Sequence, residues 1–152
     1  MKGIGFAIVA ALTTGVIAAC GQGAVPEADS AERGEAAVET VFRSYHQALQ
    51  ARDFATACAL NAPETNRKLI ERVAARGTQA RTCEEAWAAV YTLPNAGRVA
   101  DGVGRTAQVQ EITVDGDAAT ISWTFEQAPG RRLPVDTELR RIDGQWRLLD
   151  TG

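Results

Sequence analysis

The sequence predicts an α+β protein in which helices come first and an antiparallel sheet follows. Apolar residues recur at helical spacing between residues 36 and 93, and after residue 105 their period changes to two. Asp-Gly and Pro-Gly pairs separate the alternating segments. Because a run of helices followed by a run of strands usually packs as helices on one face of a sheet, we expect that architecture for residues 36–152.

The first half of this region contains four expected helices. The longest covers residues 36–51, where apolar residues at helical spacing are separated by Glu, Arg and Gln. Asp53 is typical of an N-cap and predicts a short helix directly after it. Pro63 fits the first turn of a third helix that Gly77 ends, and a capping box beginning at Thr82 predicts a fourth.

The strands are expected after the segment "NAGRVADGVG" at residues 95–104, which is so rich in glycine that it predicts a loop. Turns are expected at Asp115-Gly116, Pro129-Gly130 and Asp143-Gly144. Alternation along the strands then places one set of side chains toward the core: Ala119, Ile121, Trp123, Phe125, Val135, Thr137, Leu139, Trp146 and Leu148.

The first 20 residues predict export and lipid attachment. An apolar segment from Ile4 to Ala18 follows Lys2 and is too short for a transmembrane helix of about 20 residues, but typical of a signal peptide. It ends in "IAAC", which resembles the lipobox of bacterial lipoproteins. The resemblance implies that residues 1–19 are removed and that Cys20 carries a diacylglyceryl group, with acyl chains such as palmitate. The alternatives are an ordinary secretory signal with an incidental thiol, or an uncleaved membrane anchor.

The mature protein is therefore expected to be exported and anchored to the cell membrane, on its periplasmic or extracellular face. Two acyl chains are sufficient for stable anchoring without a spanning helix. Residues 20–35 are rich in Gly, Pro, Ala and acidic residues, with Val25 as the one sizeable apolar side chain. We expect them to form a flexible tether, and residues 36–152 have the length of one domain.

Charge and cysteine content limit the function classes. The formal charge of −3 and the scattered arginines argue against a broad nucleic-acid surface. With Cys20 lipidated, Cys58 and Cys83 remain, and in an oxidising compartment we expect them to form a disulfide. The alternatives are two free buried thiols or a metal pair. One histidine and two separated cysteines are too few for a structural zinc site, so neither a metal nor another cofactor is predicted.

Two stretches carry a family resemblance. "VFRSYHQALQARDFATACAL", residues 41–60, joins a long helix to a short one through an acidic cap, and "ELRRIDGQWRLLD", residues 138–150, forms a closing hairpin. In these stretches and in the order of its elements, the chain resembles the NTF2-like superfamily, shared with SnoaL-like and ketosteroid-isomerase-like proteins. The resemblance implies a cone in which N-terminal helices pack on a curved antiparallel sheet. The paired cysteines resemble those of its exported and lipoprotein members.

Enzymes of this superfamily use a carboxylate, or a His and a Tyr, inside the cone. His46 and Asp101 are the candidates for proton transfer here, but His46 also fits a packed amphipathic side chain and Asp101 a turn. Asp136 and Glu138 share a strand face that is expected to face water. No pair of inward acids emerges, so we assign no catalytic residue.

We therefore expect a non-catalytic domain that binds a small apolar ligand or an envelope protein. The alternatives are a cavity enzyme of SnoaL or ketosteroid-isomerase type and an accessory subunit of an envelope complex. Related folds often dimerise through the open sheet face, which adds a homodimer to the arrangements considered. The residues expected to line a cavity, or else to fill the core, are Tyr45, His46, Trp87, Tyr91, Trp123 and Phe125.

Overall fold

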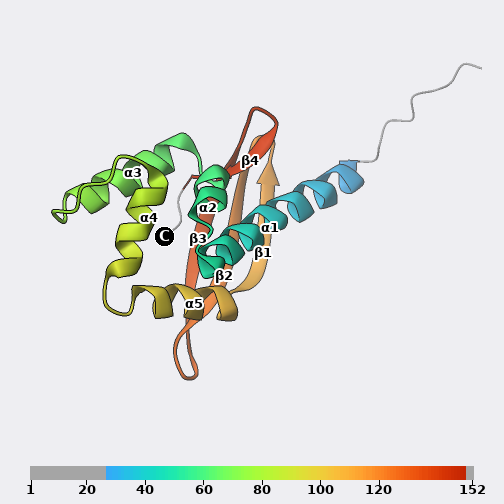
Figure 1. Ribbon diagram of the computed structural model, residues 1–152. Helices are drawn as coiled ribbons and strands as arrows, with labels where there is room; N and C mark the ends of the chain where they lie inside the picture. Colours follow the sequence, from blue (N-terminus) through green and yellow to red (C-terminus); the bar gives the residue numbers. More distant parts are fainter. Residues whose placement is uncertain (1–26, 150–152) are drawn as a thin grey trace, which may run out of the picture.

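A computed structural model describes residues 27–149, so the predicted signal peptide and Cys20 lie outside the described residues. Within that range five helices precede four strands (Figure 1). The helices are α1 (Glu27–Ala51), α2 (Phe54–Leu60), α3 (Pro63–Ala74), α4 (Cys83–Thr92) and α5 (Ala96–Thr106). The strands are β1 (Gln108–Asp115), β2 (Ala118–Ala128), β3 (Arg131–Ile142) and β4 (Gln145–Leu148).

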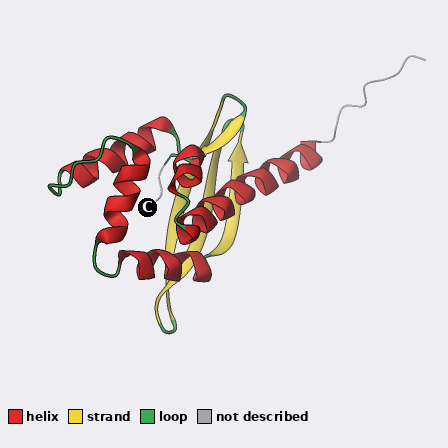
Figure 2. Ribbon diagram, viewed as in Figure 1, coloured by secondary structure: helices red, strands yellow, loops and turns green. Residues whose placement is uncertain are grey.

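The strands form one antiparallel sheet in the order β1-β2-β3-β4, and the helices lie against one of its faces (Figure 2). Register shifts between Val109 and Glu111 and between Glu126 and Ala128 mark bulges, which bend and twist a sheet. The predicted α+β class, with N-terminal helices on a curved antiparallel sheet, is confirmed. The three predicted turns also lie where the strands meet.

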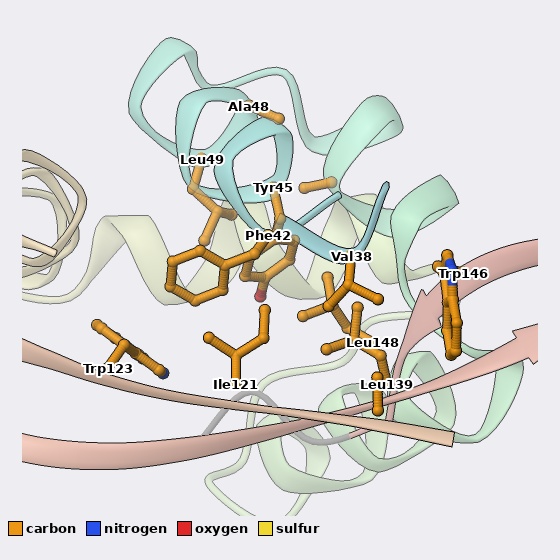
Figure 3. Close-up of a cluster of buried hydrophobic side chains, with 12 residues drawn as sticks. Val38, Phe42, Tyr45, Ala48, Leu49, Ile121, Trp123, Leu139, Trp146 and Leu148 are labelled. Atoms are coloured by element: carbon orange, nitrogen blue, oxygen red, sulfur yellow. The ribbon is translucent and has the colours of Figure 1, made fainter. Parts of the chain in front are cut away.

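The core lies between the inner face of α1 and strands β2, β3 and β4 (Figure 3). Val38 and Phe42 from α1 are buried against Ile121 from β2. The predicted inward strand residues are buried, except Phe125 and Val135, which are half-buried. Thr137 is a polar member of this set, and its hydroxyl accepts a hydrogen bond from Trp123 Nε1 at 2.9 Å, so burying it costs little.

The caps of the shorter helices follow the sequence pattern. The Asp53 carboxylate accepts a hydrogen bond from the Thr56 backbone N–H at 3.1 Å at the start of α2. At the start of α4 the Thr82 hydroxyl accepts one from the Glu85 N–H at 3.2 Å, and the Glu85 carboxylate accepts one from the Arg81 N–H at 2.7 Å. These helices therefore begin where their capping residues predict.

The predicted disulfide is confirmed. Cys58 of α2 and Cys83 of α4 are bonded, with their Cα atoms 5.9 Å apart. Both are buried in a second small core with Leu69 and Val73 of α3. The bond thus holds α2 and α4 together in a cluster whose buried members come from α2, α3 and α4.

Helix α1 begins earlier than predicted. The expected tether extended to residue 35, yet residues 27–35 are helical, and the prediction is wrong for that stretch. A methyl group added to Gly34 would lie 3.5 Å from Val114, so α1 already packs on β1 at this point. Extending an existing helix needs no new nucleus, and Ala and Glu, which recur in this stretch, are good helix formers.

Helix α5 replaces the predicted glycine-rich loop. Val99 and Val103 are four residues apart and share one face of it, which is the pattern of an amphipathic helix. Two of its three glycines lie close to the end of α1 and the residue after it. A methyl group added to Gly104 would overlap the side-chain amide of Gln50, and one added to Gly97 would lie 3.0 Å from Arg52 Nη2. Packing against α1 thus outweighs the low helix propensity of glycine here.

Candidate functional site

A pocket of about 450 Å³ lies where the C-terminal end of α1 meets α4, α5 and β2. Each helix contributes residues three or four positions apart, as expected for one face of a helix. Trp123 from β2 contributes the aromatic side chain of the sheet. The full lining is Tyr45, His46, Leu49, Arg72, Trp87, Val90, Leu93, Pro94, Asn95, Ala96, Val99, Ala100, Val103 and Trp123.

His46 is the histidine of the pocket wall. It is half-buried, and its ring makes edge contacts with Phe42 at 4.6 Å, Trp123 at 5.2 Å and Tyr45 at 5.6 Å between centroids. Burial disfavours the charged imidazolium and lowers the pKa of His46 to about 4. At neutral pH the imidazole is therefore uncharged and offers one donor and one acceptor.

Trp87 contributes a buried donor. Its ring lies against Tyr45 and Tyr91, at centroid distances of 6.4 and 6.2 Å. The indole Nε1 is buried and has no hydrogen-bond partner within residues 27–149. A buried N–H without a partner costs free energy, and such groups are few in native proteins.

Arg52 forms a corner next to the pocket, although it is not one of the lining residues. Its guanidinium donates to both oxygens of Asp101, at 2.9 and 3.2 Å, and to the Leu49 carbonyl oxygen at the end of α1. It also lies 4.3 Å from the ring centroid of Tyr91, whose hydroxyl donates to the Leu49 carbonyl oxygen at 3.1 Å. The hydrogen bond from Arg52 holds the pKa of Asp101 below its usual range. This group of contacts joins α1, α4 and α5.

The structure places the six predicted lining residues in three locations. Tyr45, His46, Trp87 and Trp123 all line the pocket. The other two do not.

Phe125 lines a neighbouring pocket of about 580 Å³ between α5 and β2, and Tyr91 belongs to the Arg52 corner. The two pockets share Asn95, Val99 and Val103.

The acidic candidates lie elsewhere. Asp101 is on helix α5 rather than in a loop, and it is paired with Arg52. Asp136 and Glu138 are exposed, and Asp136 accepts a hydrogen bond from the Ser122 hydroxyl at 2.6 Å. No carboxylate is among the residues that line the 450 Å³ pocket.

Sequence reasoning missed one wall of the site. Val99 and Val103 come from the helix that was expected to be a loop, and their spacing of four was the available indication. Arg72 of α3 was missed as well, because nothing in the sequence distinguishes it from the other arginines of that region.

Two kinds of feature are absent from residues 27–149. No helix in that range combines the length and the apolar character needed to cross a bilayer. Within the same residues, no three His, Cys, Asp or Glu side chains gather as a metal site.

Neither a protein-family model nor a curated protein matches the chain. Among solved structures, it is similar to a SEC-C motif containing protein from Rhodopseudomonas palustris, with 16% identity, a TM-score of 0.43 and coverage of 76% of this chain and 77% of that one.

Two further structures resemble it. One is described as an NTF2-like transpeptidase from Campylobacter jejuni, with 13% identity, a TM-score of 0.43 and coverage of 74% and 97%. The other is a protein of unknown function with a cystatin-like fold from Methylobium petroleophilum, with 18% identity, a TM-score of 0.40 and coverage of 78% and 79%. These similarities concern the fold and say nothing about activity.

Proposed function

We propose that this domain is a non-catalytic binding module whose pocket takes a small, mainly apolar molecule. The observation that carries the proposal is the pocket of about 450 Å³ with aromatic and aliphatic walls. Ligand sites typically have this size and combine apolar walls with a few polar groups. Here the polar groups include the neutral imidazole of His46.

Two features favour binding over catalysis by the residues considered. A general base works best when its pKa is near the working pH, and burial lowers that of His46 to about 4. Both carboxylate oxygens of Asp101 accept hydrogen bonds from Arg52, so this carboxylate is part of the contact between the end of α1 and α5. Both observations weigh against a cavity enzyme of SnoaL or ketosteroid-isomerase type that uses these two residues.

A neutral fluorescent probe tests the proposal. N-phenyl-1-naphthylamine brightens in apolar surroundings, and we expect saturable binding to the purified full-length chain. Ala100→Trp places a large ring in the pocket and should weaken binding about tenfold or more, equivalent to about 1.4 kcal/mol.

Ala88→Trp is the matched control. Ala88 is exposed on α4 and does not line the pocket, so this variant should bind as the parent does. Circular dichroism checks that both variants are folded. Absence of saturable binding to the parent, or equal binding by Ala100→Trp, would contradict the proposal. Native mass spectrometry of the same preparation would identify a ligand retained from the cell.

We also propose that the domain is exported and anchored to the cell membrane through a lipid on Cys20. The proposal is supported by the apolar segment and the lipobox-like "IAAC" of the sequence. Cys20→Ser should move the protein from the membrane fraction to the soluble fraction without changing probe binding. Continued membrane association of this variant would count against lipidation.

An envelope protein partner is the second candidate function, and the exposed rim of the pocket favours it. Leu93 is 45% exposed and Val99 is 61% exposed, which is unusual for large apolar side chains gathered in one place. A photo-crosslinker placed at Val99 in cells should give a reproducible product if a partner docks there. A product of twice the chain mass would indicate a homodimer instead, and absence of any product would count against both.

A further inference from the structure

We propose that the molecule bound in this pocket is an apolar monocarboxylate, with its carboxylate paired to Arg72 and its hydrocarbon part against the aromatic walls. The inference rests on the proposed binding function and specifies the class of ligand. It is carried by the charge of the pocket wall and by the hydrogen-bonding character of Arg72, which supplies that charge.

The wall of the pocket carries one formal charge. Arg72 is the only charged residue among the lining residues at neutral pH, because His46 is neutral and no Asp or Glu takes part. Arg72 is itself exposed to solvent, and a positive charge next to apolar walls attracts anions and repels cations. The pocket is therefore selective for a ligand with negative charge.

Arg72 has no ion pair within residues 27–149, whereas several other arginines are paired. Arg43 binds Glu39, Arg52 binds Asp101, and Arg140 binds Glu64. The position of Arg72 in the last turn of α3 suits the helix dipole, but the dipole does not require it to lie on a pocket wall. Its planar fork of donors matches the two oxygens of a carboxylate.

The hydrogen-bonding character of Arg72 narrows the class further. The Arg72 guanidinium is solvent-exposed and carries only donors, so it cannot accept a hydrogen bond. It pairs with acceptor atoms on a ligand, and a carboxylate supplies acceptors and negative charge in one group. One guanidinium balances one negative charge, which favours a monocarboxylate over a doubly charged group.

Two probes of matched size test the inference by isothermal titration calorimetry. Decanoate and decanamide have the same number of heavy atoms, but only decanoate is charged at pH 7. We expect the full-length chain to bind decanoate about tenfold more tightly, since hydrogen bonds to charged groups are the stronger ones.

Arg72→Gln should abolish this preference while decanamide binds as before. Arg67→Gln removes the same charge from an equally exposed class of position on the same helix, but one outside the pocket lining, and should keep the preference.

The outcomes separate this inference from the proposed function. Equal affinity of the parent chain for both probes, or a preference that survives in Arg72→Gln, would overturn the monocarboxylate assignment and leave apolar binding standing. A preference lost equally in Arg67→Gln would also overturn it, since the effect would then come from overall charge. If neither probe nor N-phenyl-1-naphthylamine binds, both proposals fail together.

Discussion

The core beneath the middle of α1 and the corner formed by α4 and α5 cover this helix with side chains of different size, and they pack differently. In the core, Phe42 is 2% exposed because strands on the opposite side present alternating large residues to α1. At the corner, α5 covers the end of α1 mainly with alanine, valine and glycine, and Val99 is 61% exposed. The difference shows that one helix of small residues leaves a pocket at the end of α1. The sheet, with its large side chains, leaves no such space beneath the middle of α1.

The largest effect is expected in the core. Phe42→Ala should lower the free energy of unfolding by about 3–5 kcal/mol, because it leaves a cavity between α1 and β2. Urea denaturation followed by circular dichroism measures this. A loss below about 1 kcal/mol would indicate that the core is as loosely packed as the corner, which would remove the distinction between the two regions.

An intermediate effect should come from His46, which lies between core and pocket. Its pKa is about 6.5 in the unfolded chain and about 4 when folded, so the unfolded chain binds the proton more readily. Stability should therefore fall as the pH drops from about 6.5 toward about 4. Between pH 7 and 4.5 the parent should lose roughly 2 kcal/mol more than His46→Gln does.

Carboxylates titrate in both of these proteins, so the difference between the two pH profiles isolates His46. Parallel profiles would show that the imidazole is solvated in the folded state. The pocket would then be more open to water at this wall than its ring contacts indicate.

The smallest effect is expected at the rim. Val99→Ser should change the free energy of unfolding by no more than about 0.5 kcal/mol, because the side chain is already largely in water. The same urea titration gives the answer. A loss comparable to that of Phe42→Ala would mean that α5 is packed as tightly as the core, and the comparison would fail.

Much of the fold follows from local patterns. Asp53 and Thr82 mark helix starts because their side chains bind backbone N–H groups within a few residues, which is a property of the sequence alone. Helix α5 was missed because two of its glycines, Gly97 and Gly104, lie close to Arg52 and Gln50, about fifty residues earlier in the chain. Local propensity cannot report such a tertiary contact.

The site was predictable to a lesser degree. Tyr45 and Trp123 were identified as cavity or core residues by their size and face, and both line the pocket as well as the core. Tyr91 was grouped with them, yet Arg52 covers its ring and the Leu49 carbonyl binds its hydroxyl. The place of Arg72 depends on how α3 meets α4, which no spacing within either helix determines.

Helix α1 has a consequence for how the pocket is presented. Its 25 residues span roughly 37 Å, and Tyr45, His46 and Leu49 lie near the end farthest from Cys20 in the sequence. If Cys20 is anchored as proposed, six residues separate it from the start of this helix. The helix would then hold the mouth of the pocket at the end of the domain that is farther from the membrane. A ligand would arrive from the surrounding fluid rather than by lateral transfer from the bilayer.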